Sequence, residues 1–477
     1  MRLARLLLLI LLPCAVAQAQ KAPQPVPEYF NLGPLGGKCI SQLAAAGQPA
    51  GLLIAKVTDS APAAKAGLKP GDVLTGCADN DFGKNPWREL ALAIETAEAA
   101  EDHSLKLKAQ RGTETLQLTA TLAPPAKASA GGLAPGAALR DKLIADALAW
   151  LSRQQQPDGS WQNNFSVENG LVVQTSLAGL CFLAAGFTPE KGDYATELRK
   201  AAEFVLETVG EQKQYKRLQG KNNDQTHWSL GYGAIFLAHV QHQTDAKWLA
   251  KSSLKGIKSK LKWIAGRIQS GMEDGGGFGH GPGGPNALDY IELEAMSNLL
   301  LSALGCMQRC GIEPDAKKLD KMLEFARACT DEDGNVAYST TAPQSAVKSP
   351  ARSAALANAM ASLRKTDDPI YAKVQACAQR NLEHAFDGHS TPTMHQLAFA
   401  MAAWRGGADN WAEYWKHNRV ELTMARNPGG SFAYRPTPET AMMGTNLDRD
   451  LTEVWTTSHW VLILCLEKGG LPLWCSK

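Results

Sequence analysis

A turn that pairs glycine with an aromatic residue recurs along the C-terminal two thirds of this chain. It is clearest in the segment Trp150–Trp161, where a helical pattern ends in Pro-Asp-Gly-Ser and a tryptophan follows. Weaker copies begin at Asp274, Asp333 and Pro428, at intervals too regular for one irregular domain. Repetition of this kind is typical of helical hairpins that stack and share a continuous core. The sequence therefore predicts a helical-repeat fold.

Apolar residues recur at helical spacing in about twelve segments of this region. These segments are 139–155, 168–186, 191–209, 226–242, 246–269, 286–311, 314–329, 350–364, 368–385, 391–405, 409–425 and 448–467. The even-numbered segments are the more apolar, as expected of helices that are buried on several sides, whereas the odd-numbered ones carry Lys and Glu on one face. We expect about six hairpins over residues 139–477, arranged as an inner and an outer ring in an all-α (α/α)6 toroid.

The first turn also resembles the QW motif of terpenoid cyclases and protein prenyltransferases. In that motif an aromatic-Leu pair, a Gln and a Gly-x-Trp follow at fixed intervals, and Trp150-Leu151, Gln155, Gly159 and Trp161 occupy those positions here. The resemblance implies an α/α toroid, but a shared fold does not transfer its chemistry.

Neither activity of those families is expected. Cyclases that protonate their substrate use an Asp-rich motif, and the nearest segment, Asp448-Arg-Asp450, lacks the adjoining Asp. The Asp-x-Cys segment that helps prenyltransferases to hold zinc is also missing from the sequence.

The N-terminal part of the chain has a different pattern. Its apolar residues alternate in short runs, as in half-buried strands, and the segment Gly51–Leu74 resembles the strand, short helix and Gly-Asp turn of a PDZ domain. We expect a PDZ domain over residues 27–122. The resemblance implies a loop whose backbone N–H groups bind a peptide's C-terminal carboxylate. The predicted peptide-binding residues are Leu32, Gly33, Leu35 and Gly36.

Pro34 departs from the pattern of that loop, because proline has no backbone N–H to donate. The alternative is therefore a rigid spacer module that binds no peptide. Residues 123–136 contain mostly Ala, Pro and Gly, which predicts a flexible linker between the two domains. The chain as a whole resembles a class of exported bacterial proteins that join a PDZ module to a toroid.

Residues 1–19 have the pattern of a signal peptide: a basic start, an apolar run and small residues near positions 17–20. We expect cleavage there and a periplasmic or secreted protein. Later apolar runs are shorter than the roughly 20 residues that cross a bilayer, so a transmembrane segment is not expected in the mature chain.

The charges of the chain are balanced. It has 49 basic and 47 acidic residues, and removal of Arg2 and Arg5 with the signal makes the numbers equal. Nucleic acid is therefore not an expected partner. The nine cysteines after the signal have no zinc-like CxxC spacing, and we expect no metal and no cofactor. Disulfides between Cys39 and Cys77, or Cys465 and Cys475, are possible in an exported chain.

Loops that lead into the inner helices of a ring meet at one mouth, where polar side chains are candidates for ligand contact. The candidate catalytic residues are His227, His280, Tyr290, Glu292, Arg352, Asp450 and Glu453. His389 and His395 are six residues apart, which does not place both imidazoles on one helical face. We therefore expect helix capping by Thr391 or Thr393 at that site instead of a metal.

Two functions from different classes fit these residues, and the sequence leaves open whether the chain is an enzyme. The first is an exported scaffold or binding protein, in which the PDZ module engages a peptide or protein and the toroid presents a ligand cavity. The second is a carbohydrate-active enzyme, a polysaccharide lyase or glycoside hydrolase, that binds an oligosaccharide in the mouth of the toroid. His227, His280, Tyr290, Arg352 and Glu453 would be its working set.

Overall fold

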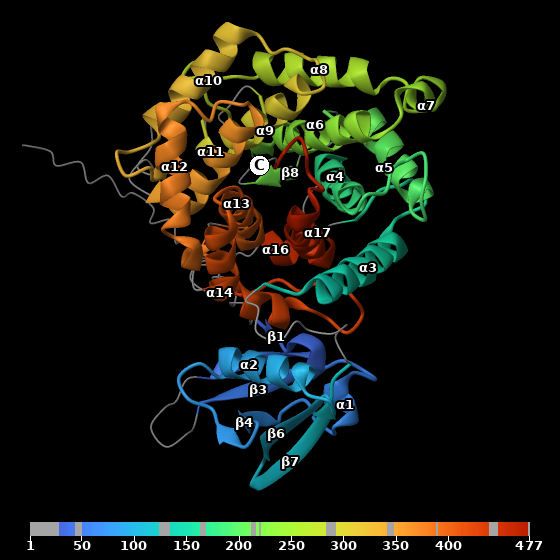
Figure 1. Ribbon diagram of the computed structural model, residues 1–477, viewed down its shortest axis with the longest axis vertical. Helices are drawn as coiled ribbons and strands as arrows, with labels where there is room; N and C mark the ends of the chain where they lie inside the picture. Colours follow the sequence, from blue (N-terminus) through green and yellow to red (C-terminus); the bar gives the residue numbers. More distant parts are fainter. Residues whose placement is uncertain are drawn as a thin grey trace, which may run out of the picture.

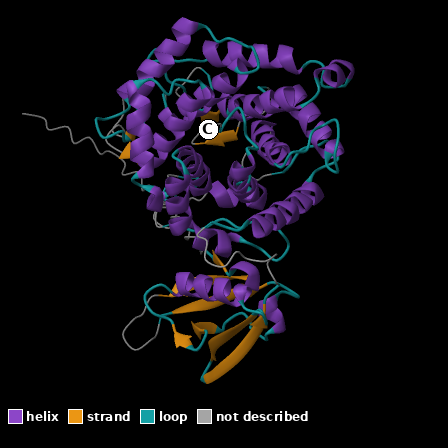
Figure 2. Ribbon diagram, in the orientation of Figure 1, coloured by secondary structure: helices purple, strands orange, loops and turns teal. Residues whose placement is uncertain are grey.

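A computed structural model describes most of the chain. The described residues are 28–42, 50–123, 134–162, 168–210, 216–218, 221–282, 292–340, 348–387, 390–437 and 447–475. The predicted signal peptide and most of the predicted linker lie outside them. An antiparallel β-sheet region comes first and a helix-rich region follows it, which agrees with the predicted order of a β region before an all-α region (Figures 1 and 2).

The N-terminal region is built on a seven-stranded sheet in which every recorded strand pair is antiparallel. Its strands are β1 (Phe30–Asn31), β2 (Gly37–Gln42), β3 (Gly51–Val57), β4 (Val73–Cys77), β5 (Asn80–Asp81), β6 (Ser104–Arg111) and β7 (Glu114–Thr121), in the order β1-β2-β3-β4-β6-β7 with β5 on β4. Helix α1 (Pro62–Lys65) follows β3, and α2 (Pro86–Ala99) contacts β3, β4 and β6. Alternate residues such as Leu105 and Leu107 point into the core that α2 covers.

Six helices of the second region form a closed circuit of contacts. They are α4 (Glu168–Ala184), α6 (Thr226–Gln243), α9 (Glu294–Gln308), α11 (Pro350–Ser362), α13 (Pro392–Arg405) and α17 (Thr452–Leu464). Each contacts the next along the chain, and α17 contacts α4 (Figure 1). We call these six the inner helices, and their side chains supply half of the largest hydrophobic core.

A second layer lies outside this circuit (Figure 1). Its helices are α3 (Ala137–Gln154), α5 (Ala195–Thr208), α7 (Ala246–Lys251), α8 (Ile257–Ser270), α10 (Ala316–Ala328), α12 (Pro369–Gln379) and α14 (Ala408–Ala425). They bury one face and expose charged residues on the other, whereas α6 and α17 bury nearly every residue. The predicted difference between even-numbered and odd-numbered segments is confirmed, since the even-numbered ones are the inner helices.

Four Gly-aromatic turns share one backbone geometry. In each, a glycine with positive φ donates its N–H to the carbonyl three residues earlier, and that earlier residue donates to the carbonyl after the glycine. These glycines are Gly159, Gly276, Gly334 and Gly430. A β-carbon on any of them would lie 2.3 to 2.7 Å from a backbone carbonyl oxygen of an outer helix. Glycine is therefore needed both for the turn and for the close approach of the next helix.

The aromatic residues of these turns, with the hydrogen bonds around them, join neighbouring helices of the hairpins. Trp161 is fully buried and donates from Nε1 to the Leu151 carbonyl at 2.8 Å. Gln155 donates to the carbonyls of Gly159 and Glu197, which ties the turn to helix α5. Phe278 and Phe432 take the same place after Gly276 and Gly430 and are also buried. The predicted repeat is thus confirmed at the level of hydrogen bonds.

Three predicted helices differ from the observed ones. The segment 246–269 forms two helices, because Ser252 is extended and its hydroxyl accepts from the Leu254 N–H, a local bond that competes with the helix. The last segment breaks at Thr452, where φ is +70° and the short helix α16 (Leu447–Asp450) gives way to α17. Helix α9 begins at Glu294; part of the predicted segment 286–311 lies outside the described residues.

The two regions share a buried junction. Val420 and Met424 of α14 are buried within the hydrophobic cluster of the sheet region. The Asn31 amide donates to the Met424 carbonyl at 2.8 Å and to the Arg426 carbonyl at 3.0 Å, at the end of α14. Because the last carbonyls of a helix have no partner within it, this amide serves as their cap.

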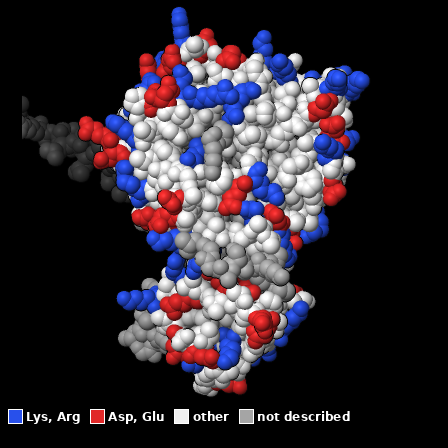
Figure 3. Space-filling view, in the orientation of Figure 1, with Lys and Arg blue, Asp and Glu red and all other residues white. Residues whose placement is uncertain are grey.

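Within the described ranges, no helix has both the length and the apolar character that a membrane crossing requires. The nine described cysteines are free thiols, so the two possible disulfides are not formed in the structure, and all but Cys310 are buried. On the face drawn in Figure 3, acidic and basic side chains are interspersed over both regions.

Candidate functional site

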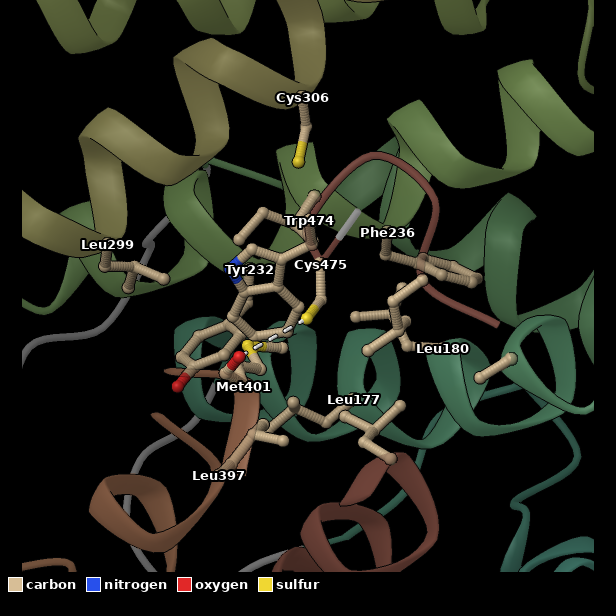
Figure 4. Close-up of a cluster of buried hydrophobic side chains, with 14 of the residues drawn as sticks. Leu177, Leu180, Tyr232, Phe236, Leu299, Cys306, Leu397, Met401, Trp474 and Cys475 are labelled. Carbon is tan, nitrogen blue, oxygen red and sulfur yellow. Dashed lines mark hydrogen bonds between the residues drawn. The ribbon is translucent and has the colours of Figure 1, made fainter. Parts of the chain in front are cut away.

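A cavity of about 60 Å³ lies between four of the inner helices and the C-terminal segment. Its polar lining is Asn298, Ser302, Arg352, Asn358 and His395. Its apolar lining includes Tyr232, Leu299, Leu397, Met401 and Trp474, which Figure 4 shows within one cluster of side chains. An ordered water needs about 10 to 15 Å³ of such space, so the cavity has room for about four waters or for a small ligand group.

Three of the five polar lining residues lie near the starts of their helices, while Ser302 and Asn358 lie further along α9 and α11. Asn298, Arg352 and His395 lie in the first two turns of α9, α11 and α13, near the N-termini of these helices. Met401 lies further along α13, and Trp474 follows the last helix of the chain. The arrangement suits a ligand with one polar end and one apolar end.

A buried carboxyl supports the polar end. Glu294 is fully buried, and its Oε2 accepts from Asn298 Nδ2 at 2.7 Å. Its Oε1 has no hydrogen-bond partner in the described part of the chain. Burial raises the pKa of Glu294 to about 8, although the nearby Arg352 charge acts to lower it. Burial therefore favours the protonated form of this carboxyl.

Arg352 is held by groups around it and is only 3% exposed. Its Nε donates to the Val336 carbonyl at 3.0 Å, and its guanidinium lies 5.3 Å from the centre of the Tyr338 ring. These contacts keep the planar guanidinium in one orientation beside the cavity. Such a group matches the geometry of a carboxylate or phosphate.

His227 and His280, two of the predicted catalytic residues, lie together but outside this cavity. His227 Nδ1 is 2.8 Å from the Gly279 carbonyl, and the His227 N–H donates to the His280 carbonyl at 3.0 Å. Trp228 Nε1 donates to His280 Nδ1 at 2.9 Å. Burial lowers the pKa of both imidazoles, that of His280 to about 4. Both rings are neutral and join the loop before α9 to the start of α6.

The other predicted catalytic residues are dispersed. Glu292 is buried and accepts from the Gly277 N–H at 3.0 Å, within the second Gly-aromatic turn. Glu453 accepts from Ser431 Oγ at 2.7 Å, and Asp450 pairs with Arg449 at 3.2 Å. Tyr290 lies outside the described residues. Of the described candidates, only Arg352 lines the cavity.

The predicted capping of α13 is wrong in the residue that accepts the hydrogen bond. Thr391 precedes the helix but its side chain caps nothing. Instead Asp448, which is fully buried, accepts from the N–H and the hydroxyl of Thr393 and also from Trp455 Nε1. Burial raises the pKa of Asp448 to about 6. This residue of the predicted Asp-Arg-Asp segment therefore ties α13 to α17.

The predicted peptide-binding residues lie at the junction between the two regions. Leu32 and Leu35 are fully buried in the sheet region's core. A β-carbon on Gly33 would lie 2.8 Å from the Thr423 carbonyl oxygen of α14, and one on Gly36 would lie 2.9 Å from Pro428 Cγ. The end of α14 therefore covers the loop that the sequence assigned to a peptide carboxylate.

Sequence reasoning missed Asn298 and Trp474, and it considered His395 only as a metal ligand or proton carrier together with His389. The signal for the first was its position four residues after Glu294, on the same face of an apolar helix. Trp474 gave no such signal, because it lies in a short tail without periodicity. Among the described residues, no three His, Cys, Asp or Glu side chains are grouped to hold a metal ion.

Comparison with known proteins gave one family and several solved structures. A family model described as a domain of unknown function, DUF6288, matches residues 141–471. No curated protein matches the chain. The type II terpene cyclase MstE from Scytonema without ligand has 14% identity and a TM-score of 0.43, over 69% of this chain and 99% of that one. A variant of MstE in complex with geranylgeranyl dihydroxybenzoate has 14% identity and a TM-score of 0.44, over 70% of this chain and 98% of that one. A protein from Actinoplanes has 12% identity and a TM-score of 0.41, over 69% of this chain and 98% of that one.

Proposed function

We propose that this chain, which belongs to the DUF6288 family, a domain of unknown function, binds a small ligand with a carboxylate at one end and an apolar body. The proposal is drawn from the geometry of the helical region. One observation carries this proposal. Arg352, Asn298 and His395 come from three different inner helices and line one cavity together with several apolar side chains and the ring of Trp474.

Two physical effects favour an anion at the polar end. The guanidinium of Arg352 offers N–H donors in the planar arrangement that a carboxylate accepts. The N-termini of α9, α11 and α13 lie at the same end, and the partial positive charge of a helix N-terminus favours negative charge. Burial raises the pKa of the nearby Glu294 carboxyl, which favours its uncharged form beside Arg352.

The apolar end favours a hydrocarbon body. Leu299, Leu397 and Met401 line the cavity together with the rings of Tyr232 and Trp474, as do the polar Ser302 and Asn358. Each buried methylene contributes about 0.8 kcal/mol to binding. A ligand of this shape would satisfy both ends of the cavity at once.

A thermal-shift and calorimetric titration with straight-chain carboxylates from propionate to octanoate tests the proposal. A ligand that binds only the folded chain raises its melting temperature. We expect Arg352→Gln to weaken binding about 10- to 100-fold, the value of a hydrogen bond to a charged group. The matched control is Arg380→Gln, an exposed arginine that donates to the Asp333 carbonyl. If both variants bind carboxylates equally well, carboxylate recognition by Arg352 is refuted. If the corresponding alcohols bind as tightly as the carboxylates, carboxylate recognition is likewise refuted.

We also propose the finer assignments of fold and location. The closed circuit of six inner helices supports an (α/α)6 toroid like that of the terpenoid cyclases and prenyltransferases, and the strand order with helix α2 supports a PDZ domain over residues 27–122. The pattern of residues 1–19 supports export. N-terminal sequencing of the mature protein tests it, and a chain that still begins at Met1 would argue against cleavage.

The two earlier hypotheses differ in their support. The binding-protein hypothesis keeps its ligand cavity, but its peptide partner has no observation in its favour, because α14 covers the loop of Leu32 and Gly33. The carbohydrate-enzyme hypothesis has none either: among the described members of its working set, Arg352 lies at the cavity, the two histidines lie elsewhere and Glu453 bonds Ser431.

A further inference from the structure

The C-terminal segment Gly470–Cys475 crosses one end of the ring of inner helices. A β-carbon on Gly470 would lie 2.1 Å from the Ala184 carbonyl oxygen, at the end of α4. Such an approach is possible only for glycine. The following side chains Leu471, Leu473 and Cys475 are buried. The segment is therefore packed as part of the core although it contains no regular secondary structure.

Three inner helices hold the backbone of this segment through side chains at their C-terminal ends. Arg309, just after α9, donates to the Leu473 carbonyl at 3.2 Å. Ser362 at the end of α11 and Arg405 at the end of α13 donate to the Trp474 carbonyl at 3.1 and 3.2 Å. Because all these donors lie at helix C-termini, the segment lies at the end of the ring opposite to Arg352.

The side chain of Trp474 lies against the apolar end of the cavity. It is 8% exposed, and its ring meets the Tyr232 ring edge-on with centroids 6.4 Å apart. Figure 4 shows Trp474 beside Tyr232 in the cluster that also contains Leu397 and Met401. The same cavity thus has a polar end near the helix N-termini and an indole ring at its other end.

We propose that Trp474 is the floor of the cavity and determines the length of apolar ligand that it accepts. The proposal rests on the proposed function, since it concerns the ligand of the same cavity. A carboxylate held by Arg352 would point its hydrocarbon chain toward the indole. The chain length that fits would then depend on the size of residue 474.

Substitution of Trp474 gives a direct test in the full chain. In Trp474→Ala the space of the indole becomes part of the cavity, and each further methylene that enters it is expected to gain about fourfold in affinity. The best-bound carboxylate should therefore be longer than in the wild type, with Trp474→Phe intermediate. Trp415→Phe is the matched control, because Trp415 is 1% exposed on α14 and does not line the cavity.

Two results separate this inference from the proposed function. If carboxylates bind in an Arg352-dependent way but the preferred length is unchanged in Trp474→Ala, the floor is refuted and the binding function stands. If no carboxylate binds to any variant, the binding function fails. Free indole added to the variants then tests separately whether Trp474 is the floor of the cavity. Indole should raise the melting temperature of Trp474→Ala but not of the wild type or Trp415→Phe, and failure to do so refutes the floor.

An unfolded Trp474→Ala chain does not end the test. Trp474→Phe keeps an aromatic ring of smaller size, and its preferred carboxylate is still expected to be longer than that of the wild type. An unchanged preference in this variant contradicts the inference.

Discussion

Arg426 donates from Nη2 to Glu98 Oε2 at 2.9 Å, and these two side chains, 10% and 8% exposed, join the helical region to helix α2 of the sheet region. The pair lies beside the Asn31 amide that caps the end of α14. A buried ion pair and a helix cap at one junction indicate that the two regions are stabilised by each other. The sheet region is therefore part of the folded unit that holds the cavity.

The ion pair gives the first prediction. We expect Glu98→Gln to lower the free energy of unfolding by about 3 kcal/mol, because it leaves the buried Arg426 charge without its counter-ion. The double variant Glu98→Gln with Arg426→Met should lose less than the sum of the two single variants. Urea unfolding measures each. Lys142→Gln breaks an exposed pair with Asp146 and should change stability by at most about 0.5 kcal/mol. Additive losses would contradict the coupling.

Two glycines with the same backbone angle give the second prediction. Gly33 has φ +59° and a β-carbon there would lie 2.8 Å from the Thr423 oxygen, whereas Gly112 has φ +58° and nothing within 4 Å. Alanine at either site incurs about 1 to 2 kcal/mol of backbone strain. We expect Gly33→Ala to cost at least about 1 kcal/mol more than Gly112→Ala, because it also overpacks the junction. Equal losses in urea unfolding would mean that α14 does not cover this loop in solution.

The pH dependence of stability should reveal Glu294. Its pKa in the folded chain is about 8, above the ordinary 4.5, so folding favours the protonated form. The stability that this group contributes is present below pH 4.5 and is lost as the pH rises through 8. The glutamine of Glu294→Gln cannot titrate, so the free energy of unfolding of this variant should fall less than that of the wild type between pH 5 and 8. Parallel curves would show that Glu294 is ionised in the fold.

His280 should have the opposite effect in acid. Its pKa in the folded chain is lowered by burial to about 4, below the ordinary 6.5, so folding favours the neutral imidazole. The corresponding stability is present above pH 6.5 and is lost as the pH falls to 4. His280→Gln should therefore lose less stability than the wild type over this range. Trp228, which donates to His280, offers a fluorescence signal for the same titration. If the stability of His280→Gln depends on acid pH as that of the wild type does, a neutral buried imidazole at residue 280 is refuted.

The parts of the fold that were predicted from the sequence are those with local causes. The Gly-aromatic turn needs a glycine at positive φ, and in three of the four turns a buried ring follows two residues later. Both features are readable from the segment around Gly159 and Trp161. Inner helices such as α6 are apolar on all sides because they are covered on all sides, so their composition alone separates them from the outer layer.

The site was less predictable. Arg352 was identified among the polar residues that lead into the inner helices. The sequence did not indicate that Arg352 would lie beside the cavity while His227, His280 and Glu453 would not. His227, Arg352 and Glu453 have the same local signal, a polar side chain near the start of an inner helix, and this signal does not show in which direction the side chain points.

The sequence by itself determined the repeating turn, the inner and outer helices and the order of a β region before a helical region, because each depends on contacts within about one hairpin. Only the tertiary structure decided the cavity and the junction. Closure of the ring places Trp474 in one space with Tyr232, and packing of the two regions places Gly33 against Thr423, hundreds of residues away in the chain. Periodicity records which face of a segment is buried, but it does not record which distant segment covers that face.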